Sequence, residues 1–172
     1  MIAEPIQSLT PEYAKRLGRR QRSEFPETWD LLDEVNDPEL PGVSLWDLGV
    51  LQDIQQTAQH IQVIITLTYS GCPAVMTMQE DIISCLKNAY PGYSIDVEIA
   101  LSPAWTTDAM SPEAKAKLKS IQITAPDVNN QVHCPLCNSS NTKLISQFGS
   151  TSCKALYQCQ QCSEAFDYFK PL

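Results

Sequence analysis

Four cysteines near the end of the chain form two Cys-x-x-Cys pairs, Cys134 with Cys137 and Cys159 with Cys162. Each pair can fold into a knuckle that presents two thiolates to one ion, and two knuckles supply the tetrahedral sulfur set that zinc prefers. The 21 residues between the pairs leave room for two strands and a turn, and a third strand would follow the second pair. We therefore predict a three-stranded antiparallel zinc ribbon over residues 133–172.

Two alternatives stay open for this module: one concerns the identity of the metal, and the other concerns its ligands. Thiolate sets also hold iron–sulfur clusters. Cys153 is a fifth cysteine in the same segment, and it could be a ligand or a small strand residue. A segment of this size cannot build a sufficient core alone, so a bound metal would supply most of its folding energy. Residues 133–172 contain three lysines, which are balanced by two acidic side chains and four metal-bound thiolates. We therefore expect no positively charged surface for nucleic acid.

Cys72, in the segment Gly71-Cys72-Pro73, is a second candidate site. Pro73 suits the first position of a helix, and this would place Cys72 at the N-cap, where the helix dipole favours an anion. We therefore expect the pKa of the Cys72 thiol to lie below its ordinary value, and the sulfur to be nucleophilic or metal-seeking. A small capping residue without chemistry is the alternative.

Acidic residues in two loops could converge on Cys72: Asp37 and Glu39 in one loop, and Asp47 in the other. Each of them could equally be a turn or cap residue. A carboxylate beside a thiolate raises the pKa of the thiol unless a cation lies between them. We therefore hypothesise that a transient iron or another metal binds there.

The elements that must position these groups follow from apolar periodicity. The pattern predicts the order α-β-β-α-β-α, which describes a compact α+β domain with a small, mixed, three-stranded sheet and helices on one face. The expected elements are helices over 26–35, 73–89 and 112–119, and strands over 50–56, 61–68 and 93–101, with a loop at 38–49. The expected organisation is a mobile arm at 1–25, in which Thr10 could cap a helix, the α+β domain at 26–123, a linker at 124–132 and the ribbon at 133–172.

The composition narrows the class of protein. The chain has 172 residues with 43% hydrophobic residues, seven cysteines and a formal net charge of −8. No apolar run approaches a membrane span and no secretory signal begins the chain, so we predict a cytoplasmic protein without a membrane partner. An odd number of cysteines excludes a fully paired disulfide framework. A basic segment at 15–22 precedes an acidic one at 24–39, which suits protein–protein docking or a solvated helix face.

Four segments resemble the SufT-like family of iron–sulfur assembly factors, in the family's order and over roughly residues 27–120. They are Asp37-Pro-Glu-Leu40, Val43-Ser-Leu-Trp-Asp-Leu-Gly49, Thr66-Leu-Thr-Tyr-Ser-Gly-Cys-Pro73 and Ser102-Pro-Ala-Trp-Thr-Thr-Asp-Ala-Met-Ser111. The resemblance implies that Cys72 is the family's reactive cysteine and that Asp47 is its neighbouring acidic residue.

The ribbon narrows the resemblance to the PaaD family, whose members are encoded with the multicomponent phenylacetyl-CoA epoxidase of aerobic phenylacetate degradation. The segments that carry it are Cys134-Pro-Leu-Cys137 and the stretch from Phe148 to Phe169. The resemblance implies an accessory protein without turnover of its own, which helps to insert an iron or iron–sulfur centre. Its partners would be the oxygenase or reductase components of the epoxidase, and an exposed sheet edge would allow a homodimer.

Two other roles stay open. The protein could be a thiol-bearing component of the epoxidase complex, or a structural adaptor that holds subunits together through the ribbon. Against an enzyme component, the chain has no Cys–His pairing, since His60 and His133 are its only histidines. It also lacks a Gly-rich dinucleotide fingerprint and the Glu-x-x-His pair of di-iron bundles.

Overall fold

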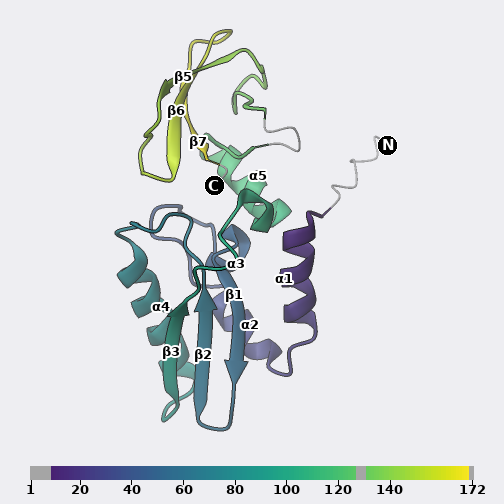
Figure 1. The fold of residues 1–172 in the computed structure, drawn as a ribbon, viewed down its shortest axis with the longest axis vertical. Helices are drawn as coiled ribbons and strands as arrows, with labels where there is room; N and C mark the ends of the chain where they lie inside the picture. Colours follow the sequence, from purple (N-terminus) through teal and green to yellow (C-terminus); the bar gives the residue numbers. More distant parts are fainter. Residues whose placement is uncertain (1–8, 127–130, 171–172) are drawn as a thin grey trace.

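Two sheets organise the chain, one in each of two stacked parts (Figure 1). The computed structural model describes residues 9–126 and 131–170. In the first sheet, β1 (Leu51–Gln56) pairs antiparallel with β2 (His60–Ile65), and β2 pairs parallel with β3 (Ser94–Ile99). The parallel pair is joined through α4 (Val75–Ala89), as the crossover between parallel strands requires. The predicted mixed, three-stranded sheet of an α+β domain is confirmed.

Alternation along β2 decides which face of this sheet is the core. Ile61, Val63 and Ile65 are fully buried, whereas the residues between them are only partly covered. The buried face packs under α4 and α2 (Pro26–Leu32), which lie behind the strands in Figure 1 and contact each other. The opposite face is polar, and its residues pair across strands, as Gln62 Nε2 does with Glu98 Oε2 at 2.6 Å.

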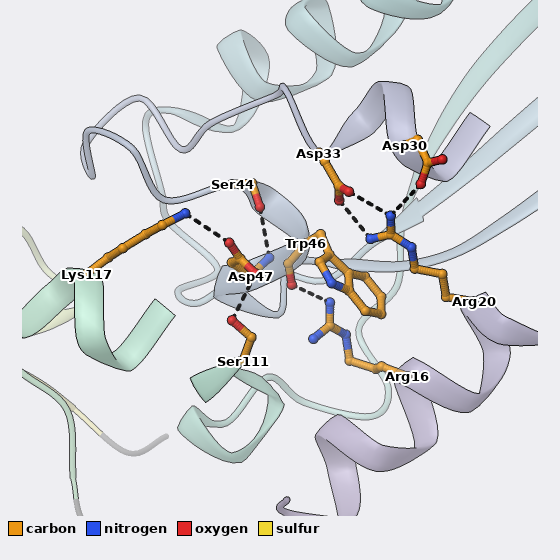
Figure 2. A network of polar contacts seen from close by, with 9 residues as sticks. All are labelled: Arg16, Arg20, Asp30, Asp33, Ser44, Trp46, Asp47, Ser111 and Lys117. Carbon is orange, nitrogen blue, oxygen red and sulfur yellow. Dashed lines mark hydrogen bonds and ion pairs between the residues drawn. The ribbon is translucent and has the colours of Figure 1, made fainter. Parts of the chain in front are cut away.

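The predicted arm at residues 1–25 contains an anchored helix, α1 (Pro11–Gln21). Residues 1–8 of that arm lie outside the described residues. Arg16 in α1 is 2% exposed, and its guanidinium donates hydrogen bonds to the carbonyls of Leu51, Trp46 and Ala109. Figure 2 shows this side chain beside the Trp46 ring, and its carbon Cζ lies 4.1 Å from the ring centroid. Because these contacts hold α1 on the domain, the structure differs from the expected mobile arm over this helix.

Short helices interrupt segments that we expected to be loops. The segment predicted as a loop at 38–49 contains α3 (Leu45–Leu48), which ends at Gly49 in the left-handed conformation, with φ 87°. A Cβ at this position would lie 2.7 Å from the Cβ of Ala109, so only glycine fits. Ala109 ends the 3₁₀ turn η1 (Thr107–Ala109), and helix α5 (Pro112–Ser120) follows it. Close backbone contact therefore fixes α3 against the segment that leads into α5.

The second sheet is the ribbon. Strands β5 (Thr142–Ser146), β6 (Lys154–Cys159) and β7 (Ala165–Phe169) pair antiparallel, as predicted. A fourth strand, β4 (Ile123–Thr124), pairs parallel with β7. The expected linker at 124–132 thus begins inside the ribbon sheet, and its residues 127–130 lie outside the described residues. Sequence reasoning missed β4 because a two-residue strand has no measurable alternation.

The ribbon and the α+β domain share a core at their junction. Phe169 of β7 is 1% exposed, and its ring centroid lies 5.3 Å from that of Trp105 in the α+β domain. Ile123 and Cys153 from the ribbon side belong to the same buried apolar cluster as the core of the first domain. The ribbon is therefore docked rather than tethered. In the described part of the chain, no helix combines the length and the apolar character needed to span a bilayer.

Candidate functional site

The four predicted cysteines of the ribbon lie together. The distance from Cys134 Sγ to Cys162 Sγ is 3.6 Å, that from Cys137 Sγ to Cys159 Sγ is 3.5 Å, and all four sulfurs lie within 4.8 Å of one another. A tetrahedral zinc ion with bonds of about 2.3 Å places neighbouring sulfurs about 3.8 Å apart. The donor set therefore fits one tetrahedral thiolate-bound metal ion.

Backbone groups shape each knuckle. The Asn138 N–H donates to the Cys134 carbonyl at 2.9 Å, and Asn138 takes a positive φ of 60° to close this turn. In the second knuckle the N–H of Cys162 donates to the Cys159 sulfur at 3.5 Å. This hydrogen bond, with the N–H of Gln161 and the neighbouring sulfurs, lowers the pKa of Cys159 to about 6. The N–H of Glu164 lowers the pKa of Cys162, but desolvation and the hydrogen bonds with the neighbouring sulfurs together outweigh it and raise the pKa to about 12. Four sulfurs at these distances are held as thiolates together only by a cation.

Cys153 is not in this cluster. Among the described residues, the only group of three or more Cys, His or acidic side chains with ligand atoms within 4.8 Å of one another is the set of four. The Cys153 sulfur contacts Thr151 Oγ1 at 3.0 Å and faces the α+β domain, whose core it joins. The alternative of Cys153 as a fifth ligand of the ribbon metal has no support in this geometry.

Cys72 lies in the turn between β2 and α4. The helix begins at Val75 with Ala74 at its N-cap, so the predicted N-cap position of Cys72 is wrong. The predicted direction of its pKa is also wrong. Burial raises the pKa of the Cys72 thiol; the N–H of Ala74 lowers it less; and the charges of Glu39, Asp37 and Cys153 raise it further. The thiol is therefore protonated at neutral pH.

A cavity of about 250 Å³ separates Cys72 from the ribbon. The α+β domain contributes one wall and the turn before β6 contributes the other. The residues that line it are Glu39, Thr68, Tyr69, Cys72, Pro73, Ser150, Thr151, Ser152 and Cys153. Of the two predicted carboxylates from the first loop, Glu39 lines the cavity. Asp37 holds that loop, since its Oδ1 accepts the Glu39 N–H at 2.8 Å, and burial raises the pKa of its carboxyl group. The structure thus brings Cys72, Glu39 and Asp37 into one region.

Asp47 lies in a different network, which Figure 2 shows. Its carboxylate accepts hydrogen bonds from Ser111 Oγ at 2.9 Å and from Lys117 Nζ at 3.2 Å. Its backbone N–H donates to Ser44 Oγ at 3.1 Å. Asp47 therefore joins α3 to α5, and it does not line the cavity beside Cys72. The sequence prediction placed Asp47 near Cys72 because both residues were expected in loops. A position in a loop does not determine the direction of the side chain, so this prediction could not be made from the sequence.

Two family models match separate parts of the chain. A model described as an iron–sulfur cluster assembly protein matches residues 27–100, and one described as the PaaD zinc beta ribbon domain matches residues 119–170. The chain is also similar to a domain of unknown function, DUF59, from Bacillus anthracis. That crystal structure has a TM-score of 0.50 and 26% identity, and the match covers 61% of this chain and 95% of that one.

The curated relatives match either about half of the chain or nearly all of it. An "Fe-S protein maturation auxiliary factor" of Porphyromonas gingivalis is 32% identical over 89 residues, which are 51% of this chain and 84% of the relative. YitW of Bacillus subtilis, with the same description, is 33% identical over 51% of this chain and 85% of its own length. Over the length of both domains, the chain is 40% identical to a protein of Escherichia coli named as a subunit of the "Putative 1,2-phenylacetyl-CoA epoxidase", covering 91% of this chain and 98% of that protein. Because both domains match in the same order, the chain belongs to the PaaD family.

Proposed function

We propose that the protein is an accessory maturation factor of the phenylacetyl-CoA epoxidase in phenylacetate degradation, and that it helps to insert an iron or iron–sulfur centre into the oxygenase or reductase component. The observation that carries the proposal is the position of Cys72, a half-buried thiol at a cavity of about 250 Å³ that the side chain of Glu39 also lines. The names of the related proteins, a subunit of this epoxidase and two iron–sulfur maturation factors, support the same role.

The chemistry of Cys72 suits transfer better than storage. A metal cargo must displace the proton of a thiol before the sulfur can bind it. Because burial raises the pKa of Cys72, displacing this proton costs more than at an ordinary cysteine. A client protein with several preformed ligands can then withdraw the cargo. The four ribbon cysteines have the opposite character, since a closed thiolate set retains its ion.

The ribbon has a structural role in this proposal. Cys134, Cys137, Cys159 and Cys162 would hold one zinc ion, which supplies folding energy and no redox chemistry. The protein core of the ribbon knuckles is small, because among the described residues only Cys134, Cys159 and Phe166 are buried in it. The metal therefore replaces a hydrophobic core that the segment is too short to build.

Exposed apolar side chains on the ribbon support the second candidate, a structural adaptor. Leu144, Ile145 and Phe148 are 38%, 49% and 64% exposed. They lie along β5 and the turn after it, where exposed apolar side chains are available to a protein partner. An adaptor would use this surface without any need for Cys72.

Replacement of Cys72 separates the two candidates. Cells that carry the epoxidase genes would express the wild type, Cys72→Ser or the matched control Cys85→Ser, and the oxygenase and reductase would be purified for activity and iron analysis. Cys85 is a suitable control because it is a partly buried cysteine of the same domain whose pKa burial also raises, yet it lies outside the cavity. We expect Cys72→Ser to reduce epoxidase activity and iron content by roughly tenfold or more, and Cys85→Ser to leave both unchanged. Full iron content and activity with Cys72→Ser would overturn the proposal and favour the adaptor.

A further inference from the structure

Cys153 faces the same cavity as Cys72, although it lies in the ribbon between its Cys-x-x-Cys pairs. We infer that Cys72 and Cys153, with the carboxylate of Glu39, form a second metal-binding site between the two domains, for a thiophilic divalent cation such as Fe²⁺. This inference rests on the proposed function in one respect, namely that Cys72 is the thiol that receives the cargo.

The backbone around Cys153 holds the second thiol in place. The Cys153 carbonyl accepts the Lys170 N–H at 3.1 Å, which ties the turn to the end of β7. The N–H of Ser150 donates to Asp167 Oδ1 at 3.1 Å, so both ends of the turn are fixed to the same strand. Cys153 itself is 8% exposed and lies in the shared core. Its thiol is thus presented to the cavity by an ordered hairpin and not by a loose loop.

The opposite wall is ordered as well. The N–H of Cys72 donates to the Tyr69 carbonyl at 3.1 Å, which closes the turn between β2 and α4. Gly71 lies against the Tyr69 ring so closely that an added Cβ would be 2.9 Å from it. Any larger residue at this position would displace the ring from the cavity wall. The turn therefore gives the Cys72 sulfur a defined approach to the cavity.

Negative charge gathers around this cavity. Glu39, Asp37 and Cys153 each raise the pKa of Cys72 through their charges, so their ionised forms lie close enough to repel a thiolate there. From the ribbon, the cation Lys154 donates to Ser150 Oγ at 3.1 Å and lowers the pKa of Asp37. Lys154 thus acts on Asp37, whereas the leading charge effects on Cys72 all come from acidic groups. A divalent cation at the cavity would remove this repulsion.

The ligands of the proposed site are not preformed around a cation, and this affects how readily the site releases it. Within the described residues, Cys72, Cys153 and Glu39 do not have their ligand atoms within 4.8 Å of one another, unlike the ribbon cluster. A cation must therefore draw the side chains together, in a space of about 250 Å³ that also accommodates several waters of about 30 Å³ each. Binding converts two thiols to thiolates and releases two protons, with no change in oxidation state. The ligands are not preformed around the ion, and protons can replace the ion on both sulfurs, so the ion is easily released.

Titration with Co²⁺ tests the site, because thiolate bound to Co²⁺ absorbs in the near ultraviolet. The full-length protein, with one zinc already bound per chain, would be titrated anaerobically as the wild type, Cys72→Ser, Cys153→Ser and Cys85→Ser, and retention of the zinc would be measured in each. We expect the wild type and Cys85→Ser to bind one further Co²⁺ with thiolate absorption. We expect Cys72→Ser and Cys153→Ser each to weaken that binding by roughly tenfold or more and to reduce the absorption.

The outcomes separate this inference from the proposed function. Co²⁺ binding by Cys153→Ser that matches the wild type overturns the inference, whether or not epoxidase maturation depends on Cys72. Loss of Co²⁺ binding in both variants, together with maturation that is indifferent to Cys72, would support the site and refute the proposed function. Because Cys153 is buried, Cys153→Ala is tested in parallel, and loss of the second ion counts only in a variant that keeps its zinc and the wild-type tryptophan emission.

Discussion

Arg16 offers the sharpest test of how the N-terminal helix is held. Its guanidinium donates to the Ala109 carbonyl at 2.5 Å, to the Trp46 carbonyl at 2.6 Å, and to the Leu51 carbonyl at 2.9 Å and 3.2 Å. Burial lowers the pKa of Arg16 to about 10, so the side chain is still charged at neutral pH. One residue of α1 thus joins α3, β1 and the turn before α5, and Arg16→Met removes all these bonds while keeping an unbranched apolar side chain.

The expected cost follows from the groups left behind. The Trp46 carbonyl keeps the Gly49 N–H at 3.0 Å, whereas the carbonyls of Leu51 and Ala109 lose their guanidinium donor. A buried carbonyl without its donor costs about 1–3 kcal/mol, and the lost cation–π contact about 0.5–2 kcal/mol. Methionine offsets part of this, because no charge must be buried. The net loss is about 3 kcal/mol, which lowers Tm by about 6–12 °C for a chain of this size.

Urea unfolding followed by tryptophan fluorescence measures this loss, because all three tryptophans lie in the α+β domain. The control is Arg19→Met on the same helix, where the guanidinium bonds to Gln52 at 3.1 Å in a half-exposed position. We expect Arg19→Met to cost less than about 1 kcal/mol. Equal free energies of unfolding for the two variants would refute the reasoning that Arg16 fastens α1 to the domain.

Metal removal and pH provide further expected outcomes. Chelation of a metal from the ribbon, or Cys134→Ser, is expected to reduce the protection of amide protons in β5–β7 but not in β2, because we propose that this metal supplies most of the ribbon's folding energy; unchanged hydrogen exchange in the ribbon would contradict this. Alkylation of Cys72 by iodoacetamide will rise with pH through a midpoint above the ordinary thiol pKa, because burial raises the pKa of Cys72. Glu39→Gln removes one of the charges that raise this pKa, so the alkylation midpoint should move to lower pH; no shift, or an upward one, would count against the charge argument.

The features that the sequence predicted correctly are governed by short-range rules. The β-branched residues of 61–68 predicted a central strand, and the structure has β2 (His60–Ile65) there, between β1 and β3. The Cys-x-x-Cys spacing predicted the knuckles for the same reason, because a tight turn within each pair brings its two sulfurs together whatever surrounds it. Local geometry was enough in both cases, and the family match confirms the ribbon.

The failures concern residues whose surroundings come from distant parts of the chain. The pKa of Cys72 was predicted from a helix end, but burial of the thiol and the charge of Glu39 raise it. In the sequence, Arg16 is one of several cations in a basic segment. Its neighbours in the sequence do not indicate that three carbonyls from separate elements surround it. Cys153 was weighed as a neighbour of the ribbon ligands because it is close to them in sequence, whereas its hairpin carries it to the other domain.

The docked position of the ribbon places it at the cavity that Cys72 lines. The maturation factors that match the first domain are covered to 84% and 85% by about half of this chain, so the match leaves the ribbon outside them. A ribbon that served only as a folding unit would need no shared core, yet Phe169 packs on Trp105 and β4 ties the sheet to the end of α5. These two attachments set the turn with Cys153 over Cys72. The ribbon therefore supplies one wall of the cavity at Cys72 and brings a second sulfur to it.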